Sequence, residues 1–170
     1  MIVTVRSLLQ TGYRRMRINA TRGFLTAIGT GLILLASTYA AVPLWSENLT
    51  FRLTLVALLN AGGGSVGLLC AWLVWTLLWP WQGLVSRAIF TVFAIGGVVL
   101  SMLGAHFLAF VPYHTEWHAP FLTYLWGIQM IFTAATVTAI FLAKGTAYLW
   151  PLGWMVPLIV AWQFGQMKVR

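Results

Sequence analysis

The chain has 170 residues, of which 61% are hydrophobic and only 7% are charged, whereas about a quarter of the residues in an ordinary soluble domain are charged. This composition excludes a soluble fold and predicts a membrane protein. Ten basic residues stand against two acidic ones, Glu47 and Glu116, with no aspartate, which excludes Walker B, kinase and aspartic-protease chemistry.

The first 23 residues differ from the rest because they hold half of the positive charge. Their arginines run among aliphatic side chains up to the first apolar run, without the cleavage pattern of a signal peptide. We expect a cytoplasmic amphipathic segment at the membrane interface. It is either a plain topology anchor or a segment that contacts anionic lipid headgroups. The arginines concerned are Arg14, Arg15, Arg17 and Arg22.

Residues 24–170 form a single predicted transmembrane domain of five apolar runs, so the fold class is an all-α, polytopic helical membrane bundle. The runs cover residues 24–43, 53–79, 88–111, 120–143 and 147–164, and a crossing helix needs about 20 residues. Four of them are uninterrupted. The fifth is broken by Pro151, Gly153 and Pro157, so a kinked or re-entrant segment is the alternative to a fifth crossing.

The basic residues also predict the orientation. With five crossings, the N-terminal arginines, Arg87 and Lys144 lie on one side, and this side is cytoplasmic by the positive-inside rule. The compact, arginine-rich chain points to a bacterial inner membrane. We expect no nucleic-acid partner, because no soluble domain carries a basic face.

The densest set of reactive side chains lies at the outer end of the third run and in the connection after it. These residues are His106, His114, Glu116 and His118. The His-x-Glu-x-His spacing offers two imidazoles and a carboxylate to a metal, or a proton acceptor beside a quinol. The spacing is not that of zinc proteases, and Pro112 and Pro120 bracket it. A solvated loop is therefore the favoured interpretation, and metal or quinol chemistry is the alternative.

His106 lies inside a span, where an ionisable residue is by default a functional hypothesis. It is a candidate single axial ligand to a haem or chlorophyll-type pigment, whereas a hydrogen bond to another helix is the favoured interpretation. Asn60 and Gln129 are strongly polar residues of the spans, and we expect them to hydrogen-bond across helices.

Small residues recur at close to helical spacing in the second and third runs, which permits close approach of helices. They are Gly63, Gly67, Gly97, Ser101 and Gly104. Two interpretations are equally supported at this point: packing within the bundle, or a docking face for a partner subunit.

These features favour a non-catalytic accessory, scaffold or assembly subunit of a larger membrane complex, with membrane lipids and other membrane subunits as partners. The minimal loops and the scarcity of ionisable groups in the spans support this function, and no motif specifies a cofactor. The first alternative is a redox, quinone- or metal-handling protein that uses the histidine-rich set. The second is a small transporter or channel for an uncharged solute.

Overall fold

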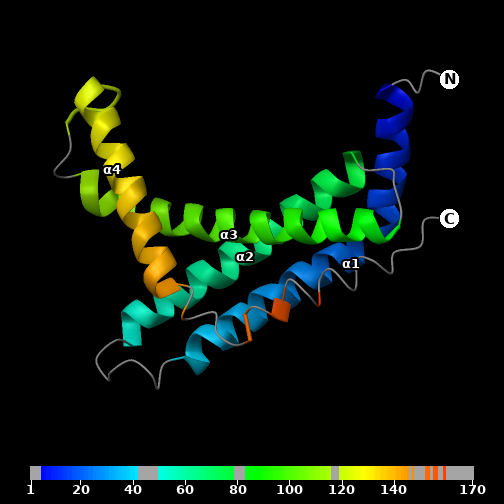
Figure 1. Ribbon diagram of the computed structural model, residues 1–170, viewed down its shortest axis with the longest axis horizontal. Coiled ribbons are helices and arrows are strands. Elements are labelled where there is room, and N and C mark those ends of the chain that lie inside the picture. The colour runs from blue at the N-terminus through cyan, green and yellow to red at the C-terminus, as the bar shows by residue number, and fades with distance from the viewer. Residues whose placement is uncertain are drawn as a thin grey trace.

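The computed structural model describes residues 5–41, 50–78, 83–115, 119–145, 147, 152–153, 155–156 and 159. Within them the chain forms four α-helices, α1 (Val5–Ala40), α2 (Thr50–Leu78), α3 (Leu84–Thr115) and α4 (Tyr124–Ile140) (Figure 1). A π-helix, η2 (Phe141–Gly145), continues α4 directly. The predicted all-α class is confirmed for these residues.

Four helices of the described chain are long and apolar enough to cross a membrane. The candidate spans are Gln10–Ala40, Leu53–Leu77, Leu84–Pro112 and Tyr124–Gly145. The protein is therefore an integral membrane protein, as its composition predicts. Most of the fifth predicted run, residues 147–164, lies outside the described residues, and a fifth crossing stays a prediction.

The basic N-terminal segment is continuous in secondary structure with the first span. Helix α1 has 36 residues, which is about 54 Å at 1.5 Å per residue and exceeds the ~30 Å of hydrocarbon. The first, darkest blue part of α1 stands at a steep angle to the remainder (Figure 1). The predicted boundary at residue 23 thus falls inside a helix, and an interfacial position for residues 1–23 stays a prediction.

The packed core is built by α1, α2 and α3, with α2 in contact with both neighbours. It also receives one side chain from η2 and one from the C-terminal segment. The buried apolar residues of this core are Leu34, Leu68, Ala71, Phe90, Ala94, Val98, Met102, Phe141 and Val156.

Helices α2 and α3 approach too closely for any side chain at positions 63 and 67 of α2. A Cβ atom on Gly63 would lie 2.7 Å from a backbone atom of α3, and one on Gly67 would meet the carbonyl oxygen of Gly97 and lie 2.8 Å from the Cβ of Ser101. The close backbone contacts that these small residues permit supply the dispersion energy that drives helix association in lipid. Gly63, Gly67, Gly97 and Ser101 therefore pack within the chain. A Cβ on Gly104, in contrast, would meet no described residue outside its own helix turn within 4 Å.

Helix α3 is longer than predicted and contains Pro112. Proline lacks the N–H that would bond to the carbonyl four residues earlier, and Pro112 lies in the last turn of α3, three residues before the helix ends at Thr115. The third apolar run was predicted to end at residue 111, and the helix continues past that point to Thr115. His114 accordingly belongs to the last turn of α3 and not to a loop.

The described positions of the C-terminal segment lie along α1. The backbone N–H of Gly153 donates to the Ser37 hydroxyl at 3.2 Å, and Val156 is buried in the core. Farther along the chain, Ile159 lies beside residues of α1 that precede Ser37. The segment thus runs antiparallel to α1.

Candidate functional site: a polar relay across three helices

Asn60 is a polar side chain buried at the centre of the three-helix core. It has 0% exposure, and an amide in hydrocarbon must find its hydrogen-bond partners inside the protein. Its Nδ2 donates to Oγ1 of Thr38 on α1 at 3.1 Å, and its Oδ1 lies 3.0 Å from Nε2 of His106 on α3. One carboxamide on α2 therefore joins three helices. We call Thr38, Asn60 and His106 the polar relay.

The relay has a defined hydrogen-bond direction. Because a carboxamide oxygen only accepts, His106 must carry its proton on Nε2, which leaves Nδ1 as the accepting nitrogen of the neutral ring. The Thr38 hydroxyl accepts from Asn60 and donates to the carbonyl of Leu34 at 2.8 Å. The donated protons thus point from α3 through α2 into the backbone of α1.

An aromatic ring from the π-helix covers the histidine. The ring centroids of His106 and Phe141 lie 5.5 Å apart with planes tilted by 51°, and Phe141 is buried. Single π-turns often occur at functional positions in helices. Here η2 brings the end of α4 back to the core and places Phe141 against the relay.

The chemistry available at the relay is limited. The polar relay itself provides one imidazole, one amide and one hydroxyl, so it can fix the helices in register and hold one proton at Nδ1. The described residues contain no group of three or more His, Cys, Asp or Glu side chains that could hold a metal ion.

The predicted metal site lies largely outside the described residues. Glu116 and His118 belong to residues 116–118, which are not described, and for His114 only the helical backbone is described. His106 is engaged with Asn60. Metal or quinol binding by this set, and a pigment on His106, remain hypotheses.

Two of the sequence expectations for polar residues are confirmed and one is wrong. Asn60 and His106 form the expected interhelical hydrogen bond. Gln129 instead accepts from the backbone N–H of Ala119 at 2.9 Å, so it fastens the turn that precedes its own helix. Thr38 was not predicted. The sequence feature that could have identified Thr38 is its position near the end of the apolar run 24–43.

Residues 63–67 also match the Gly-x-Ser-x-Gly spacing of serine hydrolases, a coincidence that the sequence reasoning missed. In those enzymes the serine stands on a sharp turn between a strand and a helix. Here Ser65 lies inside α2, and its hydroxyl faces Gly31 of α1. The spacing therefore serves helix packing.

The N-terminal arginines lie on α1. Arg14, Arg17 and Arg22 are exposed, and Arg15 is half-buried. Exposed guanidinium groups are free to meet lipid phosphates, so headgroup contact stays a prediction with accessible side chains.

The chain matches no known protein family, no curated protein and no solved structure. A functional assignment therefore depends on the geometry of the chain itself.

Replacing Thr38 with valine keeps the side-chain shape but removes the oxygen that accepts from Asn60. We expect the free energy of unfolding in lipid bicelles to fall by about 1 kcal/mol, the scale of hydrogen bonds between membrane helices. Thr138→Val is the matched control, because the Thr138 hydroxyl donates at 2.7 Å to a carbonyl of its own helix. Equal losses in the two variants would contradict the role of Thr38 in the relay.

Proposed function

We propose that the chain is a non-catalytic, membrane-embedded accessory or scaffold subunit of a larger membrane complex, and that it docks on its partner through α4. The observation that carries this proposal is that few residues of α4 are buried against the rest of the chain. Only Thr133 and Val137 of α4 are buried. In the apolar window of this span 17% of the residues are buried, against 39% in the span formed by α1.

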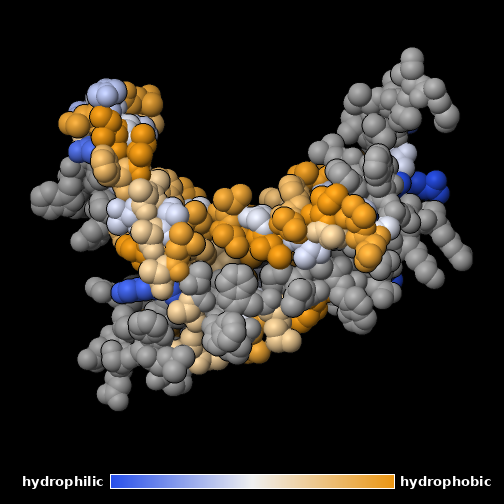
Figure 2. Space-filling view, in the orientation of Figure 1, coloured by the Kyte–Doolittle hydropathy of each residue, from blue (hydrophilic) through white to orange (hydrophobic). Residues whose placement is uncertain are grey.

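The outward side of α4 has the composition of a helix-packing surface. We define the α4 outer face as the exposed residues Ile131, Phe132, Ala135, Thr136 and Ala139. Two alanines four positions apart, with a threonine beside them, permit close approach of a second helix. Figure 2 shows the first part of α4 projecting at the upper left of the molecule, with hydrophobic residues mixed with a few polar ones on its surface.

The hydrogen bonds within the polar relay support a structural role for the core. Both polar atoms of Asn60 are occupied by neighbouring helices, so this amide is committed to holding the bundle together. A packed three-helix body with one weakly packed helix is suited to binding another membrane protein.

We further propose a bacterial inner membrane as the location, with the N-terminus in the cytoplasm. The exposed arginines of the first part of α1 support this orientation, because basic residues flanking a first span accumulate on the cytoplasmic side. In this topology the α4 outer face lies within the bilayer, and the partner is an integral membrane chain.

Ala139→Leu tests the docking face because it adds bulk where a partner helix would approach. The tagged chain is purified in mild detergent from its own membranes, and the membrane proteins that accompany it are quantified by mass spectrometry. We expect a defined partner to fall at least about tenfold, since blocking a close helix contact costs more than about 1.4 kcal/mol. Ala109→Leu, at an exposed alanine of α3, is the control and should retain the partner.

A monodisperse, partner-free monomer would overturn the proposal, as would equal loss of partners in the two variants. Haem, pigment or metal retained by the purified chain would support the redox alternative instead. A substrate-dependent flux in proteoliposomes that disappears in a His106→Ala variant would support the transporter or channel alternative.

A further inference from the structure

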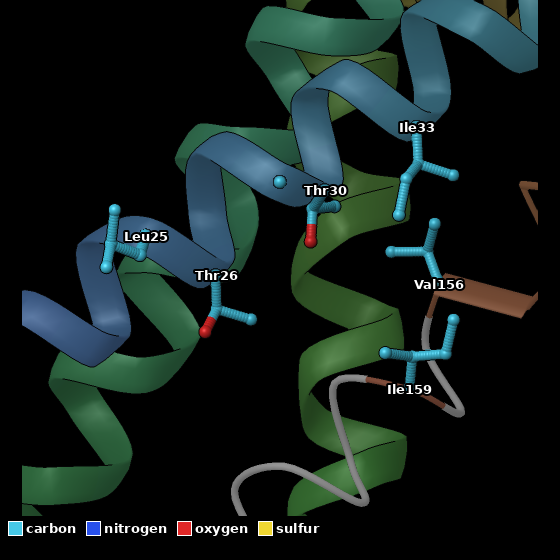
Figure 3. A pocket seen from close by; sticks show the side chains of 7 residues that line it. Leu25, Thr26, Thr30, Ile33, Val156 and Ile159 are labelled. Carbon is cyan, nitrogen blue, oxygen red and sulfur yellow. The ribbon is translucent and has the colours of Figure 1, made fainter.

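A groove with a volume of about 200 Å³ lies between α1 and the C-terminal segment. In Figure 3, Thr26, Thr30 and Ile33 point to the side of α1 on which Val156 and Ile159 lie. We call this groove between α1 and the C-terminal segment the α1 groove. Its lining residues are Leu25, Thr26, Gly29, Thr30, Ile33, Val156 and Ile159.

The α1 groove exists because Gly29 has no side chain. Among the residues that the structure describes, none outside its own helix turn comes within 4 Å of a Cβ built at this position, so the space above the glycine is open. The volume exceeds the ~150 Å³ of an apolar cavity that accepts a benzene molecule. It is therefore large enough for part of an apolar ligand.

The position of the α1 groove indicates a lipid chain as the occupant. Its α1 residues lie within the candidate span Gln10–Ala40, and residues 25–33 cover about 12 Å of helix, close to the ~15 Å depth of one leaflet's hydrocarbon. The Thr26 hydroxyl donates to the carbonyl of Arg22 at 2.7 Å. The hydroxyl therefore already has a hydrogen-bond partner in the backbone of its own helix. The groove surface beside Thr26 accordingly suits an apolar chain.

The basic side chain of Arg22 lies at the N-terminal end of the same helix face. Arg22, Thr26, Gly29 and Ile33 follow one another at spacings of four, three and four residues, which places them along one side of the helix. Arg22 is exposed, so its guanidinium can meet a phosphate at the membrane surface. An apolar groove below a cation is complementary to a lipid with an anionic head.

We propose that the α1 groove binds one acyl chain of an anionic phospholipid, whose phosphate contacts Arg22. This site lies on α1 and is separate from the α4 outer face. The lipid site and the subunit function can therefore fail independently.

The groove is tested by native mass spectrometry of the full-length protein in detergent, with added phosphatidylglycerol or phosphatidylcholine of identical acyl chains. Gly29→Leu fills the groove from a position without steric conflict. We expect it to reduce phosphatidylglycerol retention about tenfold, because it displaces at least two methylene contacts. Gly62→Leu makes the same change at an exposed glycine of α2 that is equally open, and it should retain the lipid.

The headgroup contact is tested by Arg22→Gln, which alters an exposed side chain and leaves the packing unchanged. We expect phosphatidylglycerol retention to fall about fivefold, the worth of one basic residue near an anionic surface, and phosphatidylcholine retention to stay unchanged. Lys144→Gln is the charge-matched control, because Lys144 is also exposed but lies on η2, away from the α1 groove. It should leave retention unchanged.

Three results would overturn the proposal. They are equal retention in the Gly29→Leu and Gly62→Leu variants, equal effects of the Arg22→Gln and Lys144→Gln substitutions, and equal binding of the two phospholipids by the unmodified protein. Circular dichroism of each variant establishes that the helices are intact.

Discussion

Replacing Gly67 with alanine is expected to destabilise the protein by about 3 kcal/mol, although it adds a single methyl group. The new Cβ would meet the carbonyl oxygen of Gly97 and lie 2.8 Å from the carbonyl carbon. These are backbone atoms of α3, so no side-chain rotation relieves the conflict, and the helices must separate. Overpacking of a close contact costs about 1–3 kcal/mol, and separation also loses dispersion energy that lipid does not replace.

The matched control is Gly62→Ala on the same helix. Gly62 is exposed, and a Cβ there would come within 4 Å of none of the described residues outside its own helix turn. Alanine favours a helix by up to about 1 kcal/mol relative to glycine, so this variant should be as stable as the unmodified protein or slightly more stable. The measurement is the free energy of unfolding in bicelles by denaturant titration. A Gly67→Ala variant that unfolds like the control would contradict the close α2–α3 contact.

Hydropathy predicted the helices well because a membrane span must be apolar over its whole length. The predicted run 53–79 corresponds closely to α2, Thr50–Leu78. The ends of other helices were harder to predict. Arginines in the first part of α1 and Pro112 near the end of α3 resemble boundaries in a sequence, yet both are compatible with helical backbone in the positions where they occur.

The partners of polar side chains were only partly predictable. Burial of Asn60 in a span requires hydrogen bonds, so an interhelical partner followed from the sequence. Its identity did not, because the rotation and vertical register of α1 and α3 decide whether Thr38 and His106 lie within reach. Gln129 illustrates the same gap, since a nearby backbone N–H satisfied it first.

The open faces were beyond sequence reasoning for a different reason. Hydropathy reports that a residue belongs in the membrane, but lipid and protein are equally apolar surroundings. It therefore did not distinguish Gly97, which packs on α2, from Gly104, which has open space above its Cα. The weak packing of α4 and the groove beside Gly29 likewise depend on the arrangement of whole helices.

Asn60→Leu is expected to lower the free energy of unfolding by about 2 kcal/mol. The leucine has a similar size, but the variant loses two interhelical hydrogen bonds of about 0.6–1 kcal/mol each and leaves the Nε2–H of His106 without its acceptor. Asn19→Leu is the control. Asn19 is also buried, at 7% exposure, but its Nδ2 donates to a carbonyl of its own helix, so a smaller loss is expected.

A double-mutant cycle then separates the hydrogen bond from the shape of the core. If His106 and Asn60 stabilise each other, Asn60→Leu should cost less in a His106→Phe background, because that background has no stranded N–H. We expect a coupling of about 1 kcal/mol, measured by unfolding in bicelles. If the losses in free energy of unfolding of the two single variants simply add in the double variant, the hydrogen bond between Asn60 and His106 does not stabilise the contact of α2 with α3. The burial of Asn60 would then be explained by packing alone.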